Sequence, residues 1–297
     1  MTFTVDEGTS IESFGKTLEE FNVIKSSRVF TVQSYLYEVR KIKAGTYSFN
    51  TSQSNEEIFK VINAGPEEDK KETETTTKAK GESVIVDERI VTYMHSLEKP
   101  NNNVLEEIEQ QAHIDGVPII RKEMESFLRV MLTITKPKRI LELGTAVGYS
   151  AILMSEAIEK DASIITIENY EKRIVQARDN FKKADKEDVI TMLEGDAMEI
   201  MPGLEGDSFD FVFMDAAKAQ YIHFLPEVMR LMKKGAVLIT DNVLQEGDII
   251  QSKYVVRRRD RTIHKRMREY LEVVKNHPEL ETTIVPIGDG ITISVKK

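Results

Sequence analysis

The sequence predicts an α/β protein whose larger part is a mostly parallel, doubly wound sheet, joined to a small α+β domain. From residue 138 onward, strand-like apolar stretches alternate with helical ones, an order typical of parallel sheets. Residues 66–83, PEEDKKETETTTKAKGES, contain no large apolar side chain, which predicts a linker. We therefore expect a small domain at 1–65, a linker at 66–83 and a larger domain at 84–297.

The first 65 residues are too few for a large core. Strand-like alternation covers residues 3–5 and 46–49, and amphipathic helical spacing covers 11–21 and 54–62. This mixture predicts a small α+β domain.

The larger part begins with helical patterns at residues 84–97, 104–112 and 124–134. The first strong strand follows in RILEL, and four more are expected in SIITIE, VITMLEG, FDFVFMD and AVLITDN. Helices are expected between them at 150–159, at 171–184 and up to residue 232, and after them at 262–276. The tail stretches TTIVPIG and ITISVKK flank the turn pair Asp289-Gly290, so we expect the sheet to finish in an antiparallel hairpin.

Composition limits the chemistry and the partners. The chain holds no cysteine, which excludes disulfides, thiolate metal sites and a cysteine nucleophile. Its formal net charge of -9 means that a nucleic acid would need a local basic patch. No apolar run approaches the roughly 20 residues that span a bilayer, so we expect no membrane contact and a cytoplasmic location.

The residues that finish each strand are the candidate ligand-binding residues, since open α/β sheets bind ligands beyond the carboxyl ends of their strands. In chain order they are Glu142, Gly144 and Gly148; Glu168; Gly195, Asp196 and Ala197; Asp215; and Asp241 and Asn242.

The glycine turn ELGTAVGYS, residues 142–150, raises the question of which cofactor it holds. A dinucleotide fingerprint needs three glycines as G-x-G-x-x-G, whereas this turn has only Gly144 and Gly148. Glu142 would also repel a pyrophosphate. Glu168 can accept hydrogen bonds from both hydroxyls of a ribose. A ribose together with a cationic group predicts S-adenosylmethionine, and an ordinary tight turn is the alternative for the glycines alone.

Hard oxygen ligands gather at two other strand ends. Asp215, Asp241 and Asn242 together suit Mg²⁺ or another divalent cation that keeps some waters, although each residue alone is typical of a helix cap or turn. Lys218, in FMDAAKAQY, is a candidate general base or a group that orients the reacting oxygen. The alternative for Lys218 is a solvated surface lysine.

Residues 84–297 resemble the metal-dependent class I O-methyltransferases of the catechol and caffeoyl-CoA type, in particular the bacterial tRNA 5-hydroxyuridine methyltransferases. The resemblance runs through ELGTAVGYS, ITIE, EGDA, FMDAAKAQY, TDNVL and PIGDGITISVKK. It implies a Rossmann-like fold with a seven-stranded sheet, and commonly a homodimer. It implies Mg²⁺ on Asp215, Asp241 and Asn242, with Lys218 and Asp215 in catalytic positions. The residues that it implies around S-adenosylmethionine are Glu142, Gly144, Gly148, Tyr149, Ser150, Glu168, Asp196, Ala197 and Asp215.

Such chemistry needs two adjacent oxygens on the substrate, both of which the cation binds. One hydroxyl then loses its proton, and its oxygen lies in line with the methyl sulfonium. Catechols offer such a pair, and so does 5-hydroxyuridine, whose 5-hydroxyl neighbours the 4-carbonyl. We expect methylation of 5-hydroxyuridine at the tRNA wobble position to 5-methoxyuridine. The alternative is a small catechol or a phenolic acyl-CoA substrate, and a nicotinamide dehydrogenase is disfavoured by the missing glycine.

A basic stretch favours the RNA substrate. Residues 257–268, RRRDRTIHKRMR, hold seven Lys or Arg against one Asp, enough to neutralise several phosphates. The expected contacts to the tRNA anticodon loop are Arg257, Arg258, Arg259 and Arg261. A solvated helix start or a salt-bridged dimer contact is the alternative.

The amino-terminal domain resembles a different family. Residues 3–65 are similar to the LysM-like subdomain of endolytic murein transglycosylases, through DEGTSIESFGKTLEEFNVIKSS, KIKAGTYSF and SNEEIFKVINAG. The catalytic part of that family has no counterpart in the chain, so we expect no lytic activity. We expect a spacer or remnant that does not bind peptidoglycan; a glycan-binding protein with a passenger methyltransferase fold is the alternative.

Overall fold

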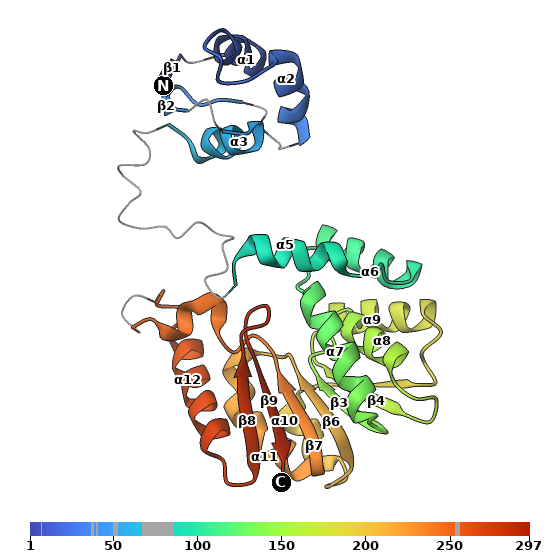
Figure 1. Cartoon of the computed structure of the whole chain (residues 1–297). Helices are drawn as coiled ribbons and strands as arrows, with labels where there is room; N and C mark the ends of the chain where they lie inside the picture. Colours follow the sequence, from blue (N-terminus) through green and yellow to red (C-terminus); the bar gives the residue numbers. More distant parts are fainter. Residues whose placement is uncertain (7, 37–38, 40, 50–52, 67–85, 253–255) are drawn as a thin grey trace. The chain divides into compact units, whose positions relative to one another are not determined.

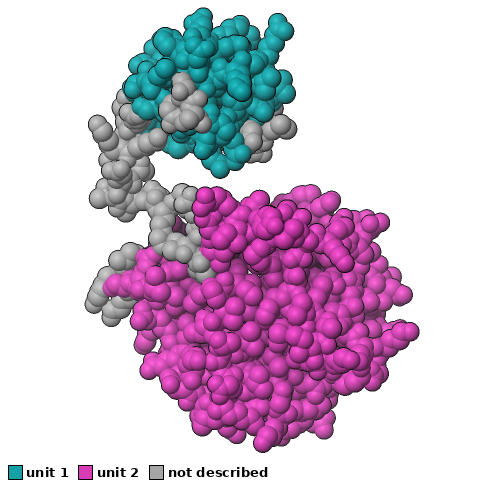
Figure 2. All heavy atoms as spheres, viewed as in Figure 1, with its two compact units in different colours: residues 1–81 teal, residues 82–297 magenta. Residues whose placement is uncertain are grey.

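The computed structural model describes residues 1–6, 8–36, 39, 41–49, 53–66, 86–252 and 256–297. The chain divides into two compact units, residues 1–81 and 82–297 (Figure 2). The predicted linker at 66–83 lies outside the described residues apart from Pro66. In the described part of the chain, no helix combines the length and the apolar character needed to cross a membrane.

The smaller unit is a two-stranded antiparallel sheet with helices (Figure 1). Its elements are β1 (Thr2–Val5), α1 (Ile11–Glu20), α2 (Ser27–Leu36), β2 (Gly45–Ser48) and α3 (Asn55–Ala64). Its core is rich in aromatic side chains, among them Phe3, Phe14, Phe30, Tyr47, Phe49 and Phe59. The expected strands and helices of this region are confirmed, and α2 is an element that the sequence pattern did not predict.

The larger unit begins with three helices and then alternates strands with helices. Its helical elements are α5 (Glu88–Leu97), α6 (Asn103–Ile114), α7 (Lys122–Thr135), α8 (Tyr149–Ala157), α9 (Glu171–Lys183), α10 (Ala197–Ile200), η1 (Met201–Gly203), η2 (Lys218–Gln220), α11 (Tyr221–Leu231), η3 (Gln245–Ile250) and α12 (Arg261–Asn276). Its strands are β3 (Arg139–Leu143), β4 (Ser163–Glu168), β5 (Ile190–Glu194), β6 (Phe209–Met214), β7 (Met232–Thr240), β8 (Leu280–Val285) and β9 (Ile291–Lys296). Short elements such as α10 and η2 were not predicted.

The seven strands form one sheet in the order β5-β4-β3-β6-β7-β9-β8. The strands from β5 to β7 are parallel neighbours, whereas β9 runs antiparallel to both β7 and β8. The predicted fold class, with its antiparallel carboxyl-terminal hairpin, is confirmed. The register pairs Thr240 with Thr292, which brings the β8–β9 turn beside the carboxyl end of β7.

Both faces of this sheet are buried (Figure 1). Ile140, Phe211 and Ile239 belong to one core with α6, α7, α8 and α9. The alternate residues Leu141, Val212 and Leu238 belong to a second core with α11 and α12. Because both faces are covered, the strands are apolar at consecutive positions, and the polar residues collect at the strand ends.

Candidate functional site

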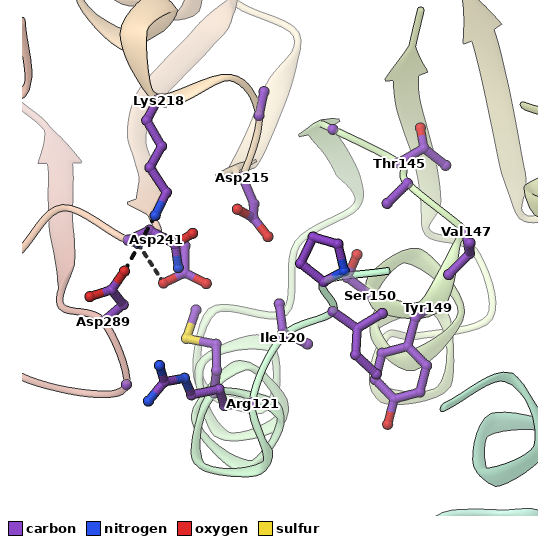
Figure 3. Close-up of a pocket in the computed structure, with 18 of the residues that line it drawn as sticks. Ile120, Arg121, Thr145, Val147, Tyr149, Ser150, Asp215, Lys218, Asp241 and Asp289 are labelled. Carbon is purple, nitrogen blue, oxygen red and sulfur yellow. Dashed lines mark hydrogen bonds and ion pairs between the residues drawn. The ribbon is translucent and has the colours of Figure 1, made fainter. Parts of the chain in front are cut away.

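A cavity of about 440 Å³ opens at the carboxyl ends of β3, β6 and β7 (Figure 3). Its walls come from the glycine turn, the loops after β6 and β7, the β8–β9 turn and the segment before α7. The predicted site residues that line it are Gly144, Tyr149, Ser150, Asp215, Lys218, Asp241 and Asn242. The predicted cofactor turn and the predicted metal ligands therefore share one space.

Gly144 brings these two groups together. Its φ of +101° lies in the left-handed region, and a Cβ added to it would lie 2.0 Å from the carbonyl oxygen of Asp215. Only glycine avoids that overlap with backbone. Gly148 has φ +82°, and a Cβ there would lie 2.6 Å from the Phe181 ring. The turn therefore packs directly on the strand end that carries the first predicted metal ligand.

Glu142 lies beneath the turn, fully buried. Its two carboxylate oxygens accept hydrogen bonds from the hydroxyls of Ser150 and Thr166, each at 2.6 Å. Burial raises the pKa of Glu142 to about 7, against the lowering effect of these two bonds. Glu142 does not line the cavity; it acts on the cavity surface through Ser150, which does.

Glu168 stands next to the turn. Its Oε2 accepts the N–H of Ala146 at 2.8 Å, and its Oε1 accepts the N–H groups of Asn169 and Tyr170 at 3.0 and 2.9 Å. A carboxylate offers about four acceptor positions, so one is left for a ribose hydroxyl.

Asp196 and Ala197 lie further from the cavity lining. Asp196 caps α10, accepting the N–H of Met198 at 2.8 Å, and Ala197 begins that helix. Together with Glu142, Gly148 and Glu168, these two are absent from the cavity wall. Their cofactor-binding roles stay predictions.

Asp215 and Asp241 are two carboxylates at the ends of β6 and β7, and Asp241 is only 6% exposed. Burial, with the negative charge of Glu142, raises the pKa of Asp215 to about 6. Burial, with the negative charge of Asp215, raises the pKa of Asp241 to about 7. The Asn242 N–H donates to Asp241 Oδ1 at 2.6 Å. Two neighbouring carboxylates that resist ionisation are well suited to a cation.

The donor set decides which cation fits. Among the described residues, no three His, Asp or Glu side chains converge on one metal position. The predicted ligands supply two carboxylates and one amide, all hard oxygen donors, from Asp215, Asp241 and Asn242. A cation that keeps several waters, as Mg²⁺ does, fits such an incomplete set.

Lys218 has a partner that the sequence did not reveal. Its Nζ lies 3.3 Å from Oδ2 of Asp289, in the β8–β9 turn (Figure 3). The Asp289 side chain is 9% exposed and that of Lys218 is 33% exposed. The ion pair fixes the ammonium group on the same side of the cavity as Asp241.

Tyr149 is tied to the helices on the other side. Its hydroxyl donates to Glu125 Oε1 at 2.7 Å and lies 3.1 Å from the amide nitrogen of Asn101. Both partners precede the glycine turn in sequence, so the first turn of α8 is held by residues from α7 and the α5–α6 loop.

Comparison with known proteins decides the family. A sequence model described as O-methyltransferase matches residues 94–297. The chain belongs to this O-methyltransferase family. It is a class I S-adenosylmethionine-dependent enzyme of the catechol and caffeoyl-CoA type.

Three relatives illustrate the match. The methyltransferase is 28% identical over 166 residues to a catechol O-methyltransferase of Mycobacterium tuberculosis, covering 56% of this chain and 73% of the relative. It is 31% identical over 181 residues to caffeoyl-CoA O-methyltransferase 1 of Eucalyptus globulus, covering 56% and 70%. The O-methyltransferase from Bacillus cereus in complex with SAH superposes with a TM-score of 0.63 and 25% identity, covering 70% of this chain and 97% of that one.

The basic stretch at 257–268 lies against the loop that carries Lys218. Arg266 Nη1 donates to the carbonyl of Ala219 at 3.1 Å. The side chains predicted to contact RNA are exposed: Arg257, Arg258, Arg259 and Arg261. Two of these four have nearby acceptors, since Arg259 lies 3.5 Å from Asp260 and Arg261 donates to the carbonyl of Val256 at 3.2 Å.

Two charged residues that line the methyltransferase cavity were missed by the sequence reasoning. Asp289 was assigned to a turn, and Arg121 was not considered, although both line the cavity. The Gly-Asp-Gly run at 288–290 was a signal for Asp289, because a carboxylate between two glycines suggests a turn built to present it. Arg121 gave no signal, since a single arginine before a helix is commonplace.

Proposed function

We propose that this methyltransferase transfers the methyl group of S-adenosylmethionine to one of two adjacent oxygens of a small catechol or phenolic substrate, with a divalent cation held by Asp215, Asp241 and Asn242. One observation carries the proposal: two carboxylates with raised pKa values line the same cavity as the glycine turn. The names of the relatives, catechol and caffeoyl-CoA O-methyltransferases, support this substrate class.

The residues of the chain divide the work. The glycine turn and Ser150 would bind the methionine part of the methyl donor, and Glu168 its ribose. The side chains of Asp215, Asp241 and Asn242 would hold the cation, which when bound supplies Lewis-acid chemistry that lowers the pKa of a substrate hydroxyl. Lys218 would orient the reacting oxygen or accept its proton.

The contact between Gly144 and Asp215 keeps the donor side and the acceptor side at a fixed separation. Fixing two reactants in this way is a large part of catalysis, because the entropy of bringing them together is lost on binding rather than in the reaction.

The test is transfer of labelled methyl from S-adenosylmethionine to catechol, to caffeoyl-CoA and to tRNA carrying 5-hydroxyuridine. Each acceptor is assayed with Mg²⁺ and with a chelator. Mg²⁺-dependent transfer to catechol or caffeoyl-CoA is the expected result. Transfer that is unchanged by the chelator would remove the cation from the proposal.

Methylation of 5-hydroxyuridine in tRNA is a second candidate, and the position of the basic stretch favours it. Four of the five residues from 257 to 261 are exposed arginines. The same basic stretch contacts the Lys218 loop through Arg266. A phosphate backbone bound there would lie near the cavity. Replacing Arg257 and Arg258 by alanine should weaken transfer to tRNA and flatten its salt dependence, while transfer to catechol stays unchanged.

The remaining expectations are proposals of the same kind. We infer a homodimer and a cytoplasmic location from the resemblance of the methyltransferase unit. The LysM-like resemblance of residues 3–65 rests on sequence motifs, and the β1-α1-α2-β2 order with antiparallel strands is compatible with it. Sedimentation of residues 1–66 with purified peptidoglycan would contradict the expectation that this unit does not bind glycan.

A further inference from the structure

The cavity is lined by a positively charged side chain, Arg121, that has no part in the proposed mechanism. Arg121 lines the cavity from the segment just before α7, and Figure 3 shows its side chain reaching toward the side where Asp241 and Asp289 lie. Among the described residues, no carboxylate lies within ion-pair distance of its guanidinium. An arginine without a partner at a small-molecule cavity is a potential ligand for an anion.

None of the neighbouring acidic groups forms an ion pair with Arg121 in the described part of the chain. Asp289 pairs with Lys218 at 3.3 Å. Glu123 is 6% exposed; its Oε2 lies 2.6 Å from His95 Nε2, whereas its Oε1 has no hydrogen-bond partner. Asp215 and Asp241 together would balance a divalent cation. The guanidinium of Arg121 therefore keeps its donors available for an anionic ligand in the cavity.

The position of Arg121 is constrained by its surroundings. Its backbone carbonyl accepts the N–H groups of Met124 and Glu125 at 2.9 and 3.0 Å, which fixes it at the start of α7. Its Cδ lies 3.6 Å from where a Cβ on Gly288 would stand, so the side chain runs along the β8–β9 turn. The stem of the side chain therefore lies at the cavity wall beside this turn, and the residue as a whole is exposed.

We propose that Arg121 binds an anionic group of the acceptor substrate, and that the preferred acceptor is a small aromatic diol carrying a carboxylate. The inference rests on the proposed function. In the proposed function the cavity of about 440 Å³ also holds the methionine part of the methyl donor, so the acceptor is small, and we place the anion on the same molecule as the two hydroxyls. A carboxylate matches the planar guanidinium with two parallel hydrogen bonds.

Two matched acceptors test this proposal. 3,4-Dihydroxybenzoate and 3,4-dihydroxybenzyl alcohol both present adjacent hydroxyls, and only the first is anionic. The wild type should prefer the acid in kcat/KM by about tenfold or more, since hydrogen bonds between charged groups contribute strongly. Arg121→Ala should abolish the preference by raising the KM for the acid, with the alcohol and the KM for S-adenosylmethionine unchanged. Arg121→Lys should retain part of the preference.

The control is Lys99→Ala, which removes an exposed positive charge that does not line this cavity and should leave the preference intact. Equal rates for acid and alcohol in the wild type would overturn the inference while the proposed function stands. So would an equal loss for both acceptors in Arg121→Ala, or a raised KM for S-adenosylmethionine, which carries its own carboxylate. If Arg121→Ala weakened transfer to tRNA alone, the inference would be overturned, because the anion bound by Arg121 would then be a phosphate of the RNA. Transfer to neither small acceptor would defeat the proposed function as well.

Discussion

The acids beside the glycine turn and the acids at the ends of β6 and β7 differ in their hydrogen-bond partners. On the cofactor side, Glu142 and Glu168 accept hydrogen bonds from hydroxyls and backbone N–H groups within the protein. On the side proposed to bind the acceptor, burial raises the pKa of both Asp215 and Asp241; the charge of Glu142 adds to the shift at Asp215, and the charge of Asp215 adds to the shift at Asp241. Burial also raises the pKa of Glu142 to about 7, but two hydroxyls donate to its carboxylate, whereas the acceptor half of the cavity holds an electrostatic cost that a cation or a proton relieves.

This difference assigns separate tasks to the two halves. Internal hydrogen bonds give the cofactor half a fixed shape, because hydroxyl and backbone N–H groups hold the carboxylates of Glu142 and Glu168. Repulsion gives the acceptor half affinity for positive charge at the expense of stability, as is common at functional sites. Substitutions in the cofactor half should therefore alter the shape of the cavity, and substitutions in the acceptor half should alter its affinity for a cation.

The largest effect is expected for Asp241→Asn. Losing one of the proposed cation ligands should reduce activity by on the order of a hundred- to a thousandfold. The metal-free protein should become more stable, because a repelled carboxylate is replaced by a neutral group of similar shape. A rise of about 2–4 °C in the unfolding midpoint corresponds to about 1 kcal/mol at this domain size.

The matched control is Asp210→Asn. That carboxylate pairs with Lys233 at 2.8 Å, and its pKa is lowered although burial opposes the shift. Its replacement should lower stability. If calorimetry showed that Asp241→Asn and Asp210→Asn shift the unfolding midpoint in the same direction, the proposed difference between repelled and paired carboxylates would be wrong.

Gly144→Ala should destabilise the protein by displacing the glycine turn of the cofactor half. The added methyl would overlap the Asp215 carbonyl at 2.0 Å, so the turn or the strand must shift, at a cost of about 2–4 kcal/mol. Gly203→Ala is the control, since a Cβ there meets nothing within 4 Å and should cost less than about 0.5 kcal/mol. Urea unfolding of both variants measures the difference; similar midpoints would mean that the close approach is easily relaxed.

Asp289→Asn tests the ion pair that spans the acceptor half. Without the carboxylate, Lys218 loses its partner at 3.3 Å, and kcat should fall by about tenfold, less than the roughly hundredfold or more expected for losing an acid–base group outright, because the lysine itself remains. Asp289→Glu should restore part of kcat because it restores the charge. A kcat that stays constant while only KM rises would indicate contact with substrate rather than positioning of Lys218.

The smallest effect is a pH dependence of stability. The folded-state pKa values of Asp215 and Asp241, about 6 and about 7, lie above the ordinary carboxyl value. The native state therefore binds more protons than the unfolded state between about pH 4 and 7, and these two groups make stability fall as pH rises through that range. Glu142, whose pKa is also raised to about 7, adds to this fall. Saturating Mg²⁺ favours the ionised forms of the two aspartates and should remove their share of it.

Thermal unfolding at pH 5 and 7.5, with Mg²⁺ and with chelator, measures this effect. The stabilisation by Mg²⁺ should be larger at pH 7.5 and should shrink in Asp241→Asn. Equal stabilisation by Mg²⁺ at both pH values would contradict the expected direction of the pH dependence.

Much of the fold could be predicted because its strands are apolar and end in polar residues. The strand in Phe209–Met214 and the helix at Arg261–Asn276 follow directly from their periodicity. Helix α2 did not, because SRVFTVQSYL alternates β-branched and polar residues without a continuous apolar stripe. Its helical form depends on burying Phe30 against the rest of the small unit.

The site could be predicted where its residues follow parallel strands in order. Asp215 and Asp241 meet because β6 and β7 are neighbours, which the alternating pattern suggests. Asp289 meets Lys218 only because β9 lies between β7 and β8. The periodicity of the sequence does not predict which strand of the carboxyl-terminal hairpin pairs with β7. Arg121 reaches the cavity from a segment before the sheet begins, so no strand-end rule could find it.

The contact between Gly144 and the Asp215 carbonyl has an evolutionary consequence. Two stretches of main chain touch there with no side chain between them, so the spacing of donor and acceptor is insensitive to most substitutions. Residues at the mouth, such as Arg121, can change without altering that spacing. Lineages built on this scaffold can thus exchange one acceptor for another while inheriting the same transfer geometry.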